Sequence, residues 1–329
     1  MAVSLPGIDL DVSGLCLGTG SFGTAIAEAD AFAMLDRFVE LGGNFLDTAK
    51  VYGDWVPEAE RSASEKVIGR WIKERACRNK IVIGTKGAHH DLSTPKQPRV
   101  SPADITSDLE ASIKSLQVDT IDLYWLHRDD ASVPVEYIVD TLESHRRHGK
   151  IRSYGASNWK PERIASANAY AAAAGAPGFV ADQILWNAAP LVSQPYGDPT
   201  VDFMSEERYV SHVRTGMAEI PYQSQANGLF NKIQALGAEN AASVIGKMYG
   251  TEETIRRYKQ MSLLVSESGL SITQIVLGYL KGQPFPTIPI IGCRNMEQLE
   301  DSMSALDVVL PAEQIAKIAD HSYYDSVNK

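Results

Sequence analysis

The sequence predicts an α/β protein: a single (β/α)8 TIM barrel over residues 1–329, with extra C-terminal helices and long loops at the C-terminal face. Three observations predict it. Apolar strand-like segments alternate strictly with amphipathic helix-like segments, eight strand-like segments occur, and 329 residues suit such a barrel with insertions. Eight βα repeats can also stay an open doubly wound sheet, but the count of eight favours closure.

The strand candidates are short apolar runs, most of which end in glycine or a polar residue. In chain order they are LCLGTG (15–20), NFLDTA (44–49), KIVIGTKG (80–87), IDLYWLHR (121–128), IRSYGASN (151–158), FVADQILWN (179–187), AEIPYQSQ (218–225) and TIPIIGC (287–293).

Amphipathic segments between the strands predict the crossover helices. The clearest cover residues 29–43, 63–76, 101–117 and 134–150. In the third, Ser101, Pro102 and Asp104 form the expected cap, first-turn proline and acidic first turn. Gly42 and Gly149 are expected C-terminal stops.

Two segments exceed the simple repeat. Residues 188–217 form a loop with proline and glycine that runs into a helix, and residues 228–280 contain more helix than one crossover needs. Long connections on a rigid scaffold are often functional, which makes both segments candidates for substrate loops or a lid. A surface excursion or an oligomer contact is an equally good interpretation.

Composition limits the function classes. The chain carries 31 Lys and Arg against 41 Asp and Glu, a net charge of -10, which argues against a nucleic-acid or anionic-membrane partner. Its three scattered cysteines do not match a disulfide framework or a zinc motif, and no other metal is expected. Without a recognisable signal peptide or apolar run of transmembrane length, we expect a cytoplasmic protein that acts on a small molecule. Its oligomeric state stays open.

Polar residues gather at the predicted strand ends, where chemistry sits in such barrels. Asp47 closes one strand and Tyr52 follows in the next loop, while Lys86 and His127 end the next two strands. A phenol of pKa about 10 is a poor proton shuttle, and an adjacent ammonium such as Lys86 lowers that value. Asp47 would neutralise and orient Lys86, and His127 would hydrogen-bond a substrate oxygen. Taken singly, each residue has an ordinary alternative as a helix cap, a surface group or a core histidine.

The motifs LGGNFLDTAKVYG, TKG, DLYWLHR, GASNW and IIGCRNMEQLED resemble the aldo-keto reductase superfamily, in that family's order and over nearly the whole chain. The resemblance implies reduction of an aldehyde or ketone by a nicotinamide cofactor, usually NADPH, with NADH as the alternative. It also implies that Asp47, Tyr52, Lys86 and His127 form the catalytic tetrad. The residues it matches to the cofactor site are Ser157, Asn158, Gln183, Tyr222, Gly228, Gly292, Arg294, Gln298 and Asp301.

The late segment has independent physical support, because Gly292 follows an apolar strand and opens a helix whose N-terminus attracts phosphate. Arg294 adds a forked donor for phosphate oxygens. The departures from the family pattern are QSQANG after Tyr222, Asp301 and Ser302 where Glu and Asn are common, and Arg128 in place of a frequent tryptophan.

The substrate is not specified by the sequence. Trp55, Trp125 and Trp159 lie at or near predicted strand ends and are candidates to line a pocket for a sugar or ring ketone, or else to pack in the core. Two rival functions also remain: a cofactor-binding regulatory subunit that resembles potassium-channel β subunits, and a lyase or aldolase that uses Lys86 as a Schiff-base amine.

Overall fold

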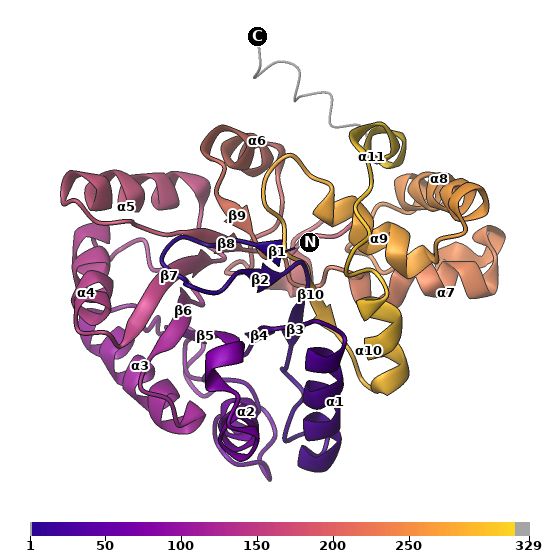
Figure 1. Cartoon of the computed structure of the whole chain (residues 1–329). Helices are drawn as coiled ribbons and strands as arrows, with labels where there is room; N and C mark the ends of the chain where they lie inside the picture. Colours follow the sequence, from indigo (N-terminus) through magenta and orange to yellow (C-terminus); the bar gives the residue numbers. More distant parts are fainter. Residues whose placement is uncertain (1, 320–329) are drawn as a thin grey trace.

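The computed structural model describes residues 2–319 and has the predicted barrel at its centre (Figure 1). Eight parallel strands follow the order β10-β3-β4-β5-β6-β7-β8-β9. Backbone hydrogen bonds from Glu219 N to Pro286 O (2.8 Å) and from Ile288 N to Glu219 O (2.9 Å) join β9 to the residues before β10 and close the ring. The strands are β3 (Cys16–Gly18), β4 (Phe45–Asp47), β5 (Val82–Gly87), β6 (Ile121–Leu126), β7 (Ile151–Ser157), β8 (Ala181–Gln183), β9 (Ala218–Glu219) and β10 (Ile290–Gly292).

Every predicted strand is present, although most are shorter than the apolar run that predicted them. The four predicted helices are also confirmed as α1 (Glu28–Glu40), α2 (Ala63–Arg75), α3 (Pro102–Leu116) and α4 (Val135–Arg147). The Ser101 side chain caps α3 by accepting a hydrogen bond from Asp104 N. Gly42 and Gly149 have φ angles of 89° and 72°, and this left-handed backbone after α1 and α4 suits glycine.

Helices α1 to α4 surround one side of the ring, and α5 (Pro161–Ala173) and α6 (Glu206–Thr215) continue around it (Figure 1). The apolar faces of α1 to α5 and the outward side chains of the strands form one buried cluster that includes Leu35, Trp71, Leu109 and Leu142. Burial of these faces holds each helix to the sheet.

A short antiparallel hairpin of β1 (Ala2–Val3) and β2 (Val12–Ser13) was not predicted. It lies across one end of the ring of strands (Figure 1). Leu5, Ile8 and Val12 join inward strand residues such as Phe45 and Trp125 in a separate apolar cluster. The interior of the barrel is therefore a packed core at this end, and chemistry is left to the carboxyl ends of the strands.

The predicted surplus of helix in residues 228–280 is present as α7 (Leu229–Leu236), α8 (Thr251–Ser268) and α9 (Ile272–Lys281), followed later by α10 (Met296–Met303) and α11 (Ala312–Ile318). A further buried cluster holds most of them to the barrel. Short 3-10 turns complete the fold at Arg78–Lys80, Pro195–Gly197, Ala226–Gly228 and Ala238–Ser243.

Within residues 2–319, no single helix is long and apolar enough to cross a membrane. The pair α8 and α9 meets the length and composition test only jointly, with a bend of 106° between them.

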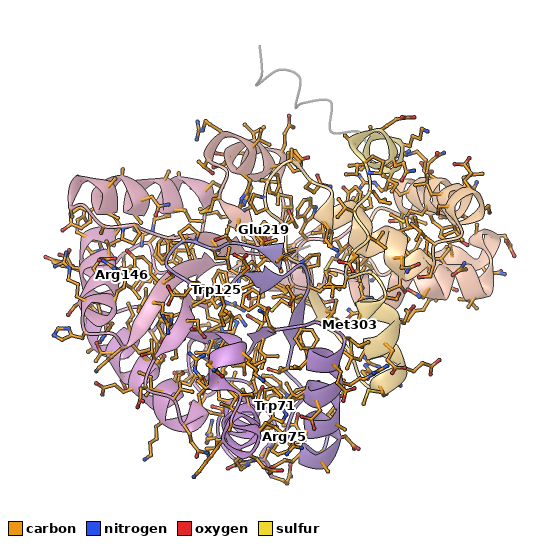
Figure 2. The ribbon with its side chains drawn as sticks, viewed as in Figure 1. Trp71, Arg75, Trp125, Arg146, Glu219 and Met303 are labelled. Atoms are coloured by element: carbon orange, nitrogen blue, oxygen red, sulfur yellow. The ribbon has the colours of Figure 1, made fainter. Side chains whose placement is uncertain are left out.

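Buried charges attach α6 to the barrel. Arg208 binds the carboxylates of Asp182 and Asp202, and His212 Nε2 lies 3.4 Å from Asp182 Oδ2 and 3.2 Å from Glu219 Oε2. Glu219 lies beneath α6 in Figure 2. Although Asp182, His212 and Glu219 offer ligand atoms within 4.8 Å of one another, Arg208 already occupies the Asp182 carboxylate. We therefore interpret the group as an ion-pair cluster.

Candidate active site

The four residues predicted to carry the chemistry meet at the carboxyl ends of three neighbouring strands. Asp47 ends β4, Lys86 is the penultimate residue of β5, and His127 directly follows β6. Lys86 Nζ lies 2.5 Å from Asp47 Oδ2 and donates to Thr48 O at 2.8 Å and to Tyr52 Oη at 3.2 Å. The ammonium is thus fixed between a carboxylate and a phenol.

Tyr52 reaches this ammonium from the loop after β4. Its backbone N donates to Ala49 O at 3.0 Å, which turns the chain back over the strand ends. The next residue, Gly53, has a φ of 102°, and a Cβ there would lie 2.7 Å from the Ala63 side chain at the start of α2. Glycine is therefore required for the loop to pack against α2 and keep Tyr52 in place.

The net effect on the Tyr52 phenol differs from the prediction. Burial raises the pKa of Tyr52 above its ordinary value, the Asp47 carboxylate adds to this, and Lys86 offsets only part of it. For Lys86, burial lowers the pKa, but the Asp47 carboxylate and the Tyr52 hydroxyl outweigh burial and raise it. Lys86 is therefore an ammonium and Tyr52 keeps its proton at neutral pH.

His127 lies beside the phenol, with its ring centroid 6.0 Å from that of Tyr52. Burial, together with nearby His89 and Arg128, holds the pKa of His127 well below its usual range. The imidazole is therefore neutral and can donate one N–H hydrogen bond without carrying charge. Its Nδ1 is buried and has no hydrogen-bond partner among the described residues.

Amide and hydroxyl groups from the next strands line the other side of the opening. Ser157 ends β7, and Gln183 ends β8 and donates from Nε2 to Asp47 Oδ1 at 3.0 Å. Asn158 Nδ2 donates to His127 O at 3.2 Å, and Tyr222 Oη donates to Asn158 Oδ1 at 2.7 Å. The structure thus brings these predicted cofactor residues together with the tetrad.

One cavity of about 610 Å³ is lined by three of the four predicted catalytic residues and by the predicted ring-binding residues: Asp47, Tyr52, His127, Ser157, Asn158, Gln183 and Tyr222. Lys86 lies outside this lining. This cavity continues into a second one of about 410 Å³, since Gln223, Asn227, Gly292 and Arg294 line both. The second cavity ends at Gln298 and Asp301 on α10 and includes Gly228, with a φ of 72°, at the start of α7. A groove therefore runs from Tyr52 to α10.

The chemistry of the groove fits an extended ligand with a flat polar ring at one end and a phosphate at the other. Hydroxyl and amide groups beside the aromatic Tyr222 suit a ring carboxamide. At the far end, the side chains of Asn295 and Gln298 organise the start of α10, where Gln298 Oε1 accepts from Arg294 N at 3.0 Å. A helix N-terminus with an arginine beside it is a favourable phosphate site.

The three tryptophans proposed for the substrate pocket lie in different places. Trp55 is half exposed, and its ring lies edge-on to Tyr52 with centroids 5.8 Å apart. Trp125, labelled among the strands in Figure 2, is fully buried, and Trp159 is fully buried against Phe179. The pocket prediction is therefore wrong for Trp125 and Trp159, because packing turns both side chains into the core.

Several lining residues were not assigned to the site from sequence. Tyr196 and Asp198 come from the long 188–217 loop, which therefore contributes to the cavity as one of its two interpretations expected. Gln223 and Asn227 have φ angles of 56° and 55° and border the groove within QSQANG, the stretch that departs from the family pattern. Arg128, another departure, lines the cavity beside His127. In both cases the departure from the family pattern was the sequence signal that could have placed these residues at the site.

Comparison with known proteins agrees with this geometry. A family model described as Aldo/keto reductase family matches residues 14–322. Norsolorinic acid reductase stcV of Emericella nidulans is 29% identical over 95% of this chain and 79% of its own length. The uncharacterized oxidoreductase YrpG of Bacillus subtilis is 30% identical, over 94% and 92%. An NADP(+) aryl-alcohol dehydrogenase of Phanerodontia chrysosporium is also 30% identical, over 96% and 84%.

Proposed function

The chain belongs to the aldo/keto reductase family, whose members are nicotinamide-dependent oxidoreductases, and on that premise we propose that it reduces an aldehyde or ketone with NADPH, using Tyr52 as proton donor. The observation that carries the proposal is the Lys86 ammonium, which lies 2.5 Å from Asp47 and 3.2 Å from the Tyr52 hydroxyl. The names of the relatives, a reductase and an NADP(+) alcohol dehydrogenase, agree with this chemistry.

The residues present fit the cofactor. Ser157, Asn158 and Gln183 would hold the nicotinamide carboxamide, Tyr222 would stack on its ring, and Arg294 would bind the 2′-phosphate that distinguishes NADPH from NADH. When bound, NADPH supplies the hydride that adds to the carbonyl carbon. The protein contributes position, charge and a cavity that restricts water.

Tyr52 supplies the proton. Negative charge develops on the carbonyl oxygen as hydride adds, and the phenol donates its hydrogen to that oxygen. Because the pKa of Tyr52 is raised, the proton is present at neutral pH, and the 3.2 Å contact with Lys86 stabilises the phenolate left behind. Asp47 fixes the ammonium and, through Gln183, links the proton donor to the cofactor side of the opening.

His127 would orient the carbonyl oxygen. The N–H of a neutral imidazole is a weaker acid than the phenol of Tyr52. His127 would therefore donate a hydrogen bond to this oxygen, and the proton would come from Tyr52. The edge-on packing of His127 on Tyr52 would place both donors on the same oxygen.

The Schiff-base alternative is disfavoured by the state of Lys86. A nucleophilic amine needs a lowered pKa. Burial alone would lower the pKa of Lys86, but the Asp47 carboxylate and the Tyr52 hydroxyl raise it, and the Nζ is held by three oxygen atoms. Borohydride trapping with a carbonyl substrate should leave Lys86 unmodified.

The Tyr52→Phe variant tests the proposal. We expect turnover of a simple aldehyde with NADPH to fall by at least about 10²-fold, the ordinary scale of a lost general acid, while NADPH still binds. Tyr137→Phe is the matched control, because Tyr137 is 60% exposed on α4. NADPH absorbance reports turnover and quenching of tryptophan fluorescence reports binding. Full activity in Tyr52→Phe would contradict the proposal, and a wild-type chain that binds NADPH without turnover of any carbonyl compound would favour the regulatory alternative.

A further inference from the structure

Arg128 places a cation in the wall of the catalytic cavity. Its side chain is only 14% exposed and lines the same cavity as Tyr52, His127 and Tyr222. We propose that Arg128 binds an anionic oxygen group, a carboxylate, on the carbonyl substrate, and that the preferred substrates are therefore aldehydes or ketones that carry such a group. This inference rests on the proposed reductase function and specifies its substrate class.

The guanidinium is held rigidly but keeps donors available. Nη1 donates to His127 O at 2.9 Å, and Nε donates to Thr200 Oγ1 at 2.9 Å. An arginine has five N–H donors, so three remain without a hydrogen bond to any described residue. The backbone carbonyl of His127 and Thr200 of the 188–217 loop fix the guanidinium from two sides. The remaining donors are therefore preorganised for a ligand.

Protein carboxylates neutralise this cation only in part. Among the described residues, Asp198 alone has a carboxylate oxygen within 4.0 Å, at 3.8 Å from Nη2, which is longer than a hydrogen bond. The other oxygen of Asp198 accepts from the backbone N and Oγ1 of Thr200 at 2.8 Å and 2.7 Å. Burial lowers the pKa of Arg128 in spite of Asp198. A largely buried cation with so distant a partner favours a second anion.

Chemistry and position favour a substrate carboxylate. The planar fork of a guanidinium matches two carboxylate oxygens better than it matches a neutral hydroxyl group. The cofactor phosphates are the other source of an anion, but the α10 residues at the phosphate end of the groove, Gln298 and Asp301, line only the second cavity, and Arg128 lines only the first. Arg128 instead adjoins His127, which would bind the carbonyl oxygen.

The experiment compares 3-carboxybenzaldehyde with its methyl ester, which has the same reacting group without the charge. In the wild-type enzyme we expect kcat/KM for the carboxylate to exceed that for the ester. In Arg128→Met the ratio of the two values should fall at least tenfold, mainly through KM for the carboxylate, and Arg128→Lys should lie between. Arg147→Met is the matched control, because Arg147 is 66% exposed on α4, and should keep the wild-type ratio.

Each outcome is decisive. An unchanged ratio in Arg128→Met, or wild-type preference for the ester, overturns the assignment. A fall in NADPH affinity in Arg128→Met, measured by fluorescence quenching, with no change in the ratio would show that the cofactor diphosphate is the anion bound. Reduction of the aldehyde group of the methyl ester by wild-type enzyme tests the proposed function separately. Failure of the proposed substrate class is therefore distinguishable from failure of the reductase assignment. Thermal melting of each variant confirms that it is folded.

Discussion

Removal of the Lys86 ammonium by Lys86→Met should affect folding and catalysis through the same contact. Lys86 Nζ lies 2.5 Å from Asp47 Oδ2, and both side chains are almost fully buried. Methionine fills similar space but leaves the Asp47 carboxylate with Gln183 Nε2, at 3.0 Å, as its remaining side-chain partner. A buried charge that loses its counter-ion is strongly destabilising.

The expected loss of unfolding free energy is about 3–5 kcal/mol near neutral pH. It should depend on pH with a definite sign. Burial already raises the pKa of Asp47 while Lys86 is present, and removal of Lys86 raises it further. A carboxyl group with a raised folded pKa binds protons more readily folded than unfolded, so its stability contribution falls as pH rises. The variant should therefore be closer to wild type at about pH 5 than at about pH 8.

The double variant Asp47→Asn with Lys86→Met separates the two roles. It removes both buried charges, and the amide oxygen of the new side chain at position 47 would still accept the Gln183 hydrogen bond. Urea unfolding followed by circular dichroism should show most of the lost stability restored. Turnover should not recover, because the phenolate of Tyr52 still has no cation beside it, and should stay at least about 10²-fold below wild type.

Two results would refute this reasoning. A Lys86→Met protein as stable as wild type at about pH 8 would mean that Asp47 is not an uncompensated charge there. Recovery of turnover in the double variant would mean that the ammonium acts only by neutralising Asp47 and not on the phenol.

His212 and Arg294 give two further predictions. Burial alone would lower the pKa of His212, but the carboxylates of Asp182 and Glu219 raise it to about 10. The stability that the charged imidazole contributes is therefore complete below about pH 6.5 and is lost as pH rises through 10. His212→Gln should cost about 3–5 kcal/mol at about pH 6.5 and less at about pH 9, where the wild-type imidazole begins to lose its charge; a cost independent of pH in urea unfolding would contradict this. Arg294→Met should raise KM for NADPH at least about tenfold and change KM for NADH little, since a charge-assisted phosphate contact is lost; an equal change for both cofactors would place the 2′-phosphate elsewhere.

The polar residues that meet at the strand ends could be predicted from the sequence, because in a barrel the order of strands along the chain sets their positions in space. Asp47, Lys86 and His127 end consecutive strands, and parallel neighbours bring such ends to one opening. The departures at Arg128 and QSQANG were visible in the sequence as well. Their geometry was not, because it depends on the 188–217 loop and on the left-handed backbone at Gln223 and Asn227.

Side-chain direction and net electrostatics were decided by tertiary packing. Trp125 and Trp159 stand near strand ends like the proposed catalytic residues, yet the core encloses both, since a residue at a strand end can turn inward or outward. The sign of the Tyr52 pKa shift likewise depends on how far the folded chain excludes water from the phenol. Burial raises this pKa by more than the nearby Lys86 ammonium lowers it. By itself the sequence determined which groups meet, because order and periodicity are local, whereas burial and charge balance arise only when distant segments pack together.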